Sequence, residues 1–271
     1  MQQAEPEEGR GLLAEQRRAA IVAEVRMRGG VRVTDLVARF GVSDMTVRRD
    51  LDALARDGRV EKVHGGAVAV GESSAHEPGF EAKRSLETGA KEAIAQAAAG
   101  LVRPGGAVAV SAGTTTYALA RHLAAVPDLT VVTNSMRIAD VLFAQPRSSG
   151  GRHGPTVVLT GGVRTPSDAL VGPVADQAIR SLNFDMVFVG CHGISADAGL
   201  TTPNLAEAET NRALIRAARR VVALADHSKW GVTGLAAFAP LSSVDTWISD
   251  SDLPEEARAA AAEHVGELLI V

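Results

Sequence analysis

Short apolar runs alternate with helical stretches from Lys83 to the end of the chain, and this alternation constrains the fold more than any other feature. The predicted strands are residues 107–111, 129–134, 156–162, 186–190, 221–226, 246–250 and 267–271. Helical patterns fall between most of them, at residues 88–101, 115–124, 204–218 and 254–265. Several strands are almost wholly apolar, which is typical of strands buried on both faces. The pattern predicts an α/β domain with an open, mostly parallel sheet covered by helices on both faces.

Composition excludes several classes of protein. Of 271 residues, 46% are hydrophobic and 22% charged, as expected for a globular chain of one or two domains. A single cysteine excludes a disulfide framework and a Cys-rich metal cluster, and it favours a reducing compartment. The seven histidines show no metal-ligand spacing, so we expect neither a metal nor a cofactor. The longest uncharged run, 104–120, has 17 residues, fewer than a membrane span needs, which predicts a soluble cytoplasmic protein without a membrane partner.

Charge divides the chain into a basic N-terminal part and an acidic remainder. Residues 14–68 hold 11 Lys and Arg against 8 Asp and Glu, a balance of +3. Since the whole chain carries −4, the remainder carries −7. The stretch GESSAHEPG at 71–79 has the composition of a linker. We therefore expect a disordered tail over 1–13, a small basic domain over 14–70, a linker over 71–84 and the α/β domain over 85–271.

The basic domain contains the pattern of a helix-turn-helix. Gly41 separates two short helical stretches, and Thr34 and Ser43 are residue types that cap helix N-termini. Both are also expected to be among the residues that bind DNA. After the second helix, residues 60–63 and 67–70 are expected to pair as a hairpin, or wing, across a glycine-containing turn. The wing residues expected to lie near the backbone of a DNA duplex are Lys62, His64 and Gly65.

The second helix predicts a surface suited to the major groove of DNA. Its apolar residues recur on one side, at Val47, Leu51 and Leu54. The residues left exposed in its N-terminal half are Met45, Thr46, Arg48 and Arg49. Guanidinium groups bind guanine or phosphate, and the methyl group of threonine suits thymine. Two adjacent arginines alone would be ordinary solvated charges, but the turn, the caps and the flanking elements together favour DNA binding.

Polar residues follow the predicted strands at the edge where open α/β sheets bind ligands. The first strand ends in SAGTTT (111–116), where Gly113 frees the backbone and Thr114 and Thr115 offer N–H and hydroxyl groups at a helix N-terminus. This predicts an anion site; the alternative is a threonine-rich cap that binds nothing. The other residues expected to contact a ligand are Ser111, Thr133, Asn134, Ser135, Gly161, Gly162, Glu207 and Lys229. Glu207 could instead only compensate the helix dipole. Cys191 is expected to be a passive thiol.

These motifs resemble the DeoR family of bacterial transcription regulators. The resemblance rests on SDMTVRRDL at 43–51, with Arg17, Ile21 and Val25 before it and KVHGGA after it, and on AGTTT, VVTNS, LTGG, EAE and DHSK further along. It implies a winged helix-turn-helix followed by a sensor domain similar in fold to ribose-5-phosphate isomerase. Family members generally bind phosphorylated sugars or related metabolites and then release double-stranded DNA, most often as repressors of carbohydrate metabolism genes.

The resemblance also implies roles for residues of the second domain. It places phosphate at residues 113–115 and hydroxyl contacts near residues 133–135, the pair Gly161-Gly162 and Lys229. Where the family pattern commonly has an aspartate before the glycine–threonine loop, this chain has Ser111. Loss of that carboxylate would weaken a contact to a sugar hydroxyl or change which effector fits.

Three functions are weighed on the sequence. The favoured one is a DNA-binding regulator, not an enzyme, assembled as a homodimer or homotetramer through the acidic domain, because one wing module neutralises few phosphates. The second is a sugar-phosphate isomerase-like enzyme with a DNA-binding appendage. Its candidate acid–base groups are Glu207, Glu209, Asp185 and Lys229, among which no clear pair emerges. The third is a structural DNA-binding protein with an inert α/β domain.

Overall fold

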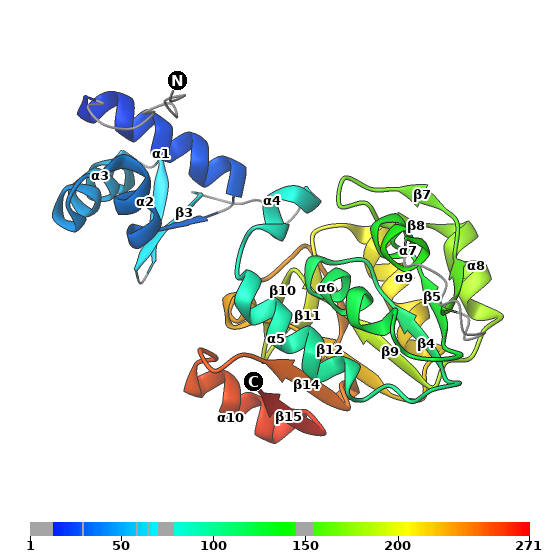
Figure 1. Cartoon of the computed structure of the whole chain (residues 1–271). Helices are drawn as coiled ribbons and strands as arrows, with labels where there is room; N and C mark the ends of the chain where they lie inside the picture. The colour runs from blue at the N-terminus through cyan, green and yellow to red at the C-terminus, as the bar shows by residue number, and fades with distance from the viewer. Residues whose placement is uncertain (1–12, 29, 58, 64, 70–78, 145–153) are drawn as a thin grey trace. The chain divides into compact units, whose positions relative to one another are not determined.

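The chain divides into two units, Met1–Ser73 and Ser74–Val271, in the computed structural model (Figure 1). The structure describes residues 13–28, 30–57, 59–63, 65–69, 79–144 and 154–271. The predicted tail, apart from Leu13, and residues 71–78 of the predicted linker lie outside the described residues. The rest of that linker differs from expectation, because residues 80–84 form a helix of the second unit, α4 (Phe80–Arg84).

The first unit combines helices with a small antiparallel sheet of order β1-β3-β2. Its elements are α1 (Ala14–Arg28), β1 (Gly30–Arg32), α2 (Val33–Phe40), α3 (Asp44–Arg56), β2 (Val60–Val63) and β3 (Gly66–Ala69). β2 and β3 pair from Val60↔Ala69 to Val63↔Gly66, which confirms the predicted wing. β1 pairs with β3 on the other side, and a strand of 3 residues carries too little pattern to be predicted.

The turn of the helix-turn-helix has the predicted geometry. Gly41 ends α2 in the left-handed conformation, with φ 62°, which favours glycine. The Ser43 Oγ accepts a hydrogen bond from the Thr46 backbone N–H (3.2 Å) and so caps α3. The predicted apolar stripe of α3 is buried in the core of this unit, at Val47, Leu51 and Leu54.

The start of α2 differs from the prediction. The helix begins at Val33 with Arg32 as its N-cap, so Thr34 lies in the first turn and does not cap it. Arg32 is still paired with Gly66 in the sheet and has an extended backbone. The helix therefore starts directly after the strand, one position before the expected cap.

A parallel sheet of order β15-β14-β12-β9-β4-β5-β6 is the frame of the second unit and confirms the predicted α/β class. Its strands are β4 (Ala107–Val110), β5 (Thr130–Thr133), β6 (Thr156–Leu159), β9 (Met186–Val189), β12 (Val221–Leu224), β14 (Thr246–Ser249) and β15 (Glu267–Ile270). Every predicted strand appears, and each ends one to three residues earlier than expected. The polar and glycine residues at their carboxyl ends leave the ladder and form loops.

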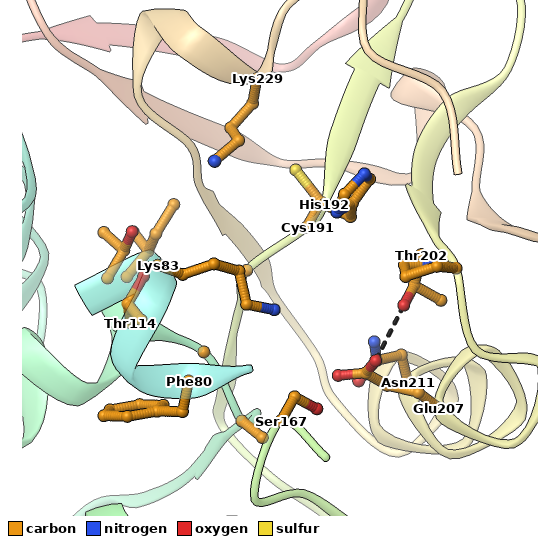
Figure 2. A pocket seen from close by; sticks show the side chains of 16 residues that line it. Phe80, Lys83, Thr114, Ser167, Cys191, His192, Thr202, Glu207, Asn211 and Lys229 are labelled. Carbon is orange, nitrogen blue, oxygen red and sulfur yellow. Dashed lines mark hydrogen bonds between the residues drawn. The ribbon is translucent and has the colours of Figure 1, made fainter. Parts of the chain in front are cut away.

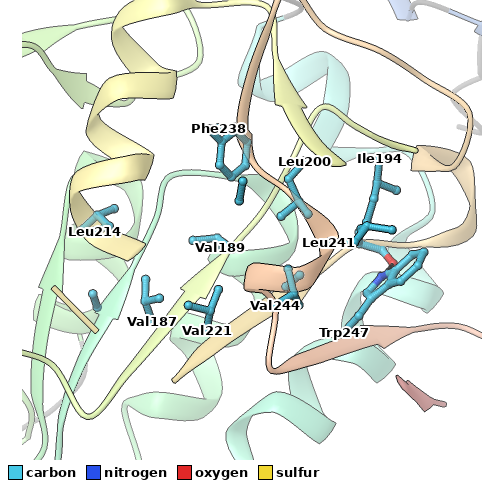
Figure 3. Close-up of a cluster of buried hydrophobic side chains, with 14 of the residues drawn as sticks. Val187, Val189, Ile194, Leu200, Leu214, Val221, Phe238, Leu241, Val244 and Trp247 are labelled. Atoms are coloured by element: carbon cyan, nitrogen blue, oxygen red, sulfur yellow. Dashed lines mark hydrogen bonds between the residues drawn. The ribbon is translucent and has the colours of Figure 1, made fainter. Parts of the chain in front are cut away.

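Helices cover both faces of this sheet (Figure 1). The larger ones are α5 (Thr88–Ala99), α6 (Thr114–Leu123), α7 (Met136–Phe143), α8 (Pro173–Arg180), α9 (Leu205–Arg216) and α10 (Glu255–His264). α5, α6 and α7 bury Ile94, Leu119 and Ile138 against one face, whereas α9 buries Leu214 against the other (Figure 3). Successive strand residues point to opposite cores, which explains the continuous apolar runs. Among the described helices, none combines the length and apolar character needed to cross a bilayer.

Two smaller sheets lie beyond the main one. One is antiparallel, of order β10-β11-β13, and the other pairs β7 with β8. Their strands are β10 (Gly193–Ser195), β11 (Gly199–Thr202), β13 (Ala236–Ala239), β7 (Val163–Arg164) and β8 (Leu170–Val171). Strands of two to four residues give no alternation long enough to predict. Short 3-10 turns, η1 (His227–Lys229) and η2 (Leu241–Ser243), follow β12 and β13.

The strand order reverses between β4 and β9. From β4 the chain adds β5 and β6 on one side; it then returns to place β9 on the other side of β4 and continues to β12, β14 and β15. In open α/β sheets the carboxyl ends of strands at such a reversal form a crevice that binds ligands. The loops that follow β4 and β9 are therefore where a ligand site is expected.

Candidate functional site

The outer face of α3 carries residues predicted to bind DNA. Met45 is 63% exposed, and Arg48 and Arg49 are exposed beside it. Arg48 Nε donates to Asp44 Oδ1 (2.5 Å), a hydrogen bond that raises the pKa of the Arg48 guanidinium. Within the described part of the chain, no ion pair holds Arg49. An exposed pair such as Arg48–Asp44 is easily exchanged for a phosphate partner.

Ser43 and Thr46 are engaged in starting the same helix. Their hydroxyl oxygens lie 2.9 Å apart, in addition to the cap that Ser43 provides. Thr46 is half-buried as a result. Thr34, in α2, is exposed and its hydroxyl donates to Asp35 Oδ1 (3.4 Å). The structure therefore gives Ser43 and Thr46 a positioning role and leaves Met45, Arg48 and Arg49 directed outward.

The wing places its predicted cation beside α3. Lys62 Nζ lies 2.5 Å from Asp52 Oδ1, and this hydrogen bond lowers the pKa of Asp52. Gly65 is exposed with φ 79°, and its carbonyl accepts from the Val33 N–H (2.9 Å), which ties the wing turn to the start of α2. His64, also predicted to bind DNA, lies outside the described residues.

A basic groove runs along this face, defined by Arg18, Arg49, Asp52, Ala55, Arg56 and Lys62. It holds four cations and one carboxylate. Sequence reasoning missed Arg18 and Arg56. The spacing of Arg49 and Arg56, seven residues or two helical turns apart, could have indicated the second of them.

A pocket opens at the carboxyl ends of β4 and β9, where the strand order reverses (Figure 2). Five of the predicted effector-binding residues line it: Gly113, Thr114, Thr115, Glu207 and Lys229. The polar and aromatic lining residues that sequence reasoning left out are Phe80, Lys83, Ser167, His192, Thr202 and Asn211. Phe80 and Lys83 lie in α4 and Thr202 lies in β11, elements that were themselves not predicted, whereas Ser167 and His192 lie in loops. Asn211 could have been found, since it lies one turn after Glu207 on the same helix.

The loop after β4 has the geometry of an anion site. α6 begins at Thr114, and its N-cap residue, Gly113, provides no side-chain hydrogen bond to the first turn. The first N–H groups of α6 therefore have no side-chain cap, and they lie at the positive end of the helix dipole in residues that line the pocket. Thr115 is buried at the same turn, and the Thr116 hydroxyl donates back to the Gly113 carbonyl (3.1 Å).

Four predicted ligand contacts lie behind this loop and support it. The Asn134 Oδ1 accepts from the Ala112 N–H (2.9 Å), and the Ser111 Oγ accepts from the Gly190 N–H (3.2 Å). The Thr133 hydroxyl donates to a strand carbonyl, and Ser135 caps α7. All four are buried and none lines the pocket. Asn134 and Ser111 thus bond the loops that follow β4 and β9, whereas the side chains of Thr133 and Ser135 bond the end of β4 and the start of α7.

The glycines after β6 also lie off the pocket. Gly161 and Gly162 have φ 71° and 118°, conformations that favour glycine. A Cβ on Gly162 would lie 2.6 Å from the Val171 carbonyl oxygen, so this residue allows close packing against β8. The reason is topological, since β6 is the edge strand, two strands away from β4.

The opposite wall of the pocket comes from α9. Glu207 and Asn211 project from one face of this helix, and the Thr202 hydroxyl donates to Glu207 Oε2 (2.8 Å; Figure 2). The Asn204 side chain caps α9 by accepting from the Glu207 N–H (3.2 Å) and its neighbour. This wall therefore presents carboxylate, amide and hydroxyl groups toward the anion loop.

Three lysines surround the site. Lys83 and Lys229 line the pocket, whereas Lys91 is 4% exposed and lies outside the lining. Lys91 Nζ donates to the carbonyl oxygens of Lys83 (2.7 Å) and Leu86 (2.5 Å). Burial lowers the pKa of Lys91 to about 8, although the buried carboxylate of Asp226 acts in the opposite direction.

The single cysteine, Cys191, lines the pocket, and its thiol is expected to be unreactive. Burial raises the pKa of the Cys191 thiol to about 12, so it stays protonated at neutral pH. This agrees with the expected passive role.

One group of metal-capable side chains lies together among the described residues: His227, Asp250 and Asp252, whose ligand atoms are within 4.8 Å of one another. His227 Nδ1 lies 2.6 Å from Asp250 Oδ2, and the His227 N–H donates to Asp250 Oδ1 (2.7 Å). Although burial acts to raise it, these bonds lower the pKa of Asp250. The two residues thereby join the ends of β12 and β14, while Asp252 is exposed.

Comparison with known proteins matches both units. The family model described as DeoR-like helix-turn-helix domain matches residues 17–73, and the one described as DeoR C terminal sensor domain matches residues 86–251. The chain is 32% identical to the putative aga operon transcriptional repressor of Escherichia coli O157:H7, over 94% of this chain and 93% of that protein. It is 30% identical to the glycerol-3-phosphate regulon repressor of Escherichia coli strain K12, over 92% of this chain and 96% of that protein.

A solved structure of ribose 5-phosphate isomerase A from Methanocaldococcus jannaschii is a more distant likeness, with 15% identity, a TM-score of 0.37, and coverage of 52% of this chain and 53% of that one. The family matches span both units, and the two repressors align with nearly the full length of the sequence. The chain therefore belongs to the DeoR family of DNA-binding transcription regulators.

Proposed function

We propose that this protein is a transcriptional repressor that leaves its operator when a phosphorylated sugar or a related anionic metabolite binds the pocket at the ends of β4 and β9. One observation carries the proposal. The pocket sets the uncapped start of α6 and two lysines opposite a wall of hydroxyl, amide and carboxylate groups. The first set suits a phosphate and the second suits the hydroxyls of a small polyol or sugar.

On the DNA side, α3 enters the major groove with Met45, Arg48 and Arg49 toward the base edges. Lys62 and Gly65, with His64, contact the sugar–phosphate backbone from the wing. The basic groove along α3 adds Arg18 and Arg56 as phosphate contacts. Exposure of these cations on one face supports this assignment.

On the effector side, residues 113–115 hold the phosphate through the N–H groups of the α6 start, assisted by Lys229. Glu207 and Asn211 bind hydroxyls of the remaining molecule. The buried residues Ser111 and Asn134 act indirectly, by holding the loop. A relative named for the glycerol-3-phosphate regulon supports a small phosphorylated metabolite as the effector class.

The active species is a homodimer or homotetramer joined through the second unit. Reading a pseudo-palindromic operator takes two helix-turn-helix modules, with half-sites about 34 Å apart or a multiple of that spacing. Light scattering on the full-length protein tests this, and a strict monomer bound tightly to one half-site would contradict it.

A regulator fits the pocket better than an isomerase. Moving a proton between carbons requires a general base and a partner that stabilises the enediolate. Among the described lining residues Glu207 is the one carboxylate, and it already accepts from Thr202. Incubation with ribose 5-phosphate or fructose 6-phosphate, followed by NMR, would reveal any isomerised product.

The deciding experiment pairs a thermal-shift screen with DNA binding. Full-length protein is screened against phosphorylated sugars and glycerol 3-phosphate, each beside its unphosphorylated parent. A ligand at 100 times its Kd stabilises by about 2.7 kcal/mol, which is a readable shift. The same ester should weaken binding to a duplex selected by the protein from a random library.

Two lysine variants make the result specific. Lys229→Gln should remove most of the thermal shift, whereas Lys62→Gln, the same change in the first unit, should leave it intact. If no phosphorylated compound shifts the melting temperature, or if the responding ester leaves DNA affinity unchanged, the proposed function is wrong.

A further inference from the structure

The short helix α4 belongs both to the pocket wall and to the start of the second unit. Phe80 and Lys83 line the pocket, and Figure 2 shows the Lys83 side chain extending from α4 toward the centre, between Thr114 and Glu207. α4 is also the first described element after β3, the last strand of the first unit. In the sequence, α4 therefore directly follows the segment that joins the two units.

The position of α4 is set from beneath by buried contacts. Lys91 of α5 donates to the carbonyl oxygens of Lys83 and Leu86, so a buried cation holds the C-terminal end of the helix. Phe80, 4% exposed, packs edge-on against Tyr117 of α6 with ring centroids 5.3 Å apart. The helix that begins at the anion loop is thus the helix on which α4 rests.

A second connection reaches the far side of the pocket. Arg137 of α7 has its guanidinium 5.3 Å from the centre of the Phe80 ring, and its Nη2 lies 3.3 Å from Glu81 Oε1. The same guanidinium donates from Nε to Asp168 Oδ2 (2.7 Å). Asp168 directly follows Ser167, which lines the pocket. Arg137, which lies outside the pocket lining, therefore joins α4 to the loop that contributes Ser167 to the pocket wall.

We propose that Lys83 contacts the bound anion and that α4 transmits effector binding toward the DNA-binding unit. This inference rests on the proposed function, because it assumes an anionic effector in the same pocket. A phosphate seated at the start of α6 has a negative charge that Lys83, which lines the same pocket as Lys229, can approach. Allosteric coupling requires that the effector bind one conformation of the protein more tightly than another. An ion pair between Lys83 and the effector would favour the position of α4 in which that pair forms.

The test compares two neighbouring substitutions in the full-length protein. Lys83→Gln removes the cation that lines the pocket, and Arg84→Gln removes the next cation of the same helix, which packs over Tyr117 outside the lining. Binding of glycerol 3-phosphate, ribose 5-phosphate and fructose 6-phosphate is measured by calorimetry. Release of the selected duplex is measured by fluorescence anisotropy at saturating ester.

We expect the wild type and Arg84→Gln to bind the responding ester alike and to lose DNA affinity alike, by about 5–150-fold. Lys83→Gln should bind the ester about tenfold or more weakly, as expected for loss of a hydrogen bond to a charged group. At saturation it should release little DNA, while its affinity for DNA without ester stays that of the wild type.

The outcomes separate the two proposals. If the wild type binds none of the three esters, the proposed function fails, whatever the variants do. If the wild type responds but Lys83→Gln binds with unchanged affinity, Lys83 is not an effector contact. If Lys83→Gln binds weakly yet releases DNA fully at saturation, the contact stands and the role of α4 in transmission is overturned.

Discussion

Arg17 of α1 and Asp50 of α3 form a buried ion pair in which Nε lies 2.6 Å from Oδ2. Arg18 adds a second contact, from its Nε to Asp50 Oδ1 (2.9 Å). The side chains of Arg17 and Asp50 are 10% and 3% exposed. The pair fixes α1 against the inner side of the helix whose outer side we propose to read DNA.

Replacing Asp50 with alanine should unfold the first unit selectively. Breaking a buried ion pair by removing one partner costs about 3–5 kcal/mol, a large fraction of the stability of a small domain. Both tryptophans, Trp230 and Trp247, lie in the second unit, so their fluorescence reports that unit alone. In urea, circular dichroism should show an early loss of helix while the fluorescence transition stays in place. The control is Asp52→Asn, which changes an exposed carboxylate of the same helix. If the circular dichroism and fluorescence transitions of Asp50→Ala both stay at the urea concentrations of the wild type, the prediction is wrong.

Arg56→Gln should weaken DNA binding equally for all sequences. A phosphate contact contributes counterion release, so the slope of log K against log salt should become less steep by about 0.9. Titrations of the selected duplex and of a scrambled duplex at several salt concentrations measure both slopes. An unchanged slope would mean that the basic groove does not reach the backbone.

Arg49→Gln should instead reduce discrimination between sequences. A bidentate contact to a base is worth about 1–3 kcal/mol against the wrong base, and Arg49 is free of ion pairs within the described residues. The measurement is the ratio of affinities for the selected duplex and single-base variants. If every ratio matches that of the wild type, Arg49 is a phosphate contact rather than a reader of sequence.

Lys91 should give the protein a distinctive pH dependence of stability. Its pKa is about 8 in the folded chain and 10.5 ordinarily. Below pH 8 both states carry the proton and burial of the charge costs a constant amount. Between pH 8 and 10.5 the unfolded chain alone keeps the proton, so this group makes folding more favourable as pH rises, by up to about 3 kcal/mol.

Comparison with Lys91→Met isolates that contribution. The free energy of unfolding of the wild type minus that of the variant should increase from pH 7.5 to 10.5 (chosen to bracket the two pKa values). Equal pH profiles for the two proteins would show that Lys91 titrates normally in the fold.

Cys191 should resist alkylation in the native protein. With its pKa raised to about 12, the reactive thiolate is scarce at neutral pH. Since the chain has one cysteine, mass spectrometry after iodoacetamide treatment reads this site alone. Rapid labelling at a rate equal to that of the unfolded chain would contradict the assignment.

The main sheet and α3 could be predicted because each gives a strong local pattern in the sequence. The strands are short continuous apolar runs, the Val47 stripe repeats at the period of a helix, and Gly41 and Ser43 mark the turn between two helices. The loop at Gly113 was also predictable, since it follows from the rule that strand ends bind ligands.

The rest of the pocket depends on contacts between distant parts of the chain. α4 was assigned to the linker because its 5 residues are too few for a helical pattern, and Lys83 was missed with it. Asn134 and Ser111 were expected to touch the ligand because they are polar and follow strands. Their hydrogen bonds to backbone N–H groups of neighbouring loops, which no sequence period reveals, turn them inward.

Two parts of the pocket differ in how they are built: Asn134 holds the loop after β4, and side chains of α9 form the wall opposite. The Asn134 amide accepts from the Ala112 N–H on one side and donates to the Leu170 carbonyl on the other (3.2 Å), so a buried residue fixes the loop that we propose to hold the phosphate. The wall opposite includes Glu207 and Asn211, two side chains that project from one face of α9. In the effector site that we propose, substitutions on α9 would therefore change which metabolite fits, while the loop at the start of α6 would keep its contacts to the phosphate.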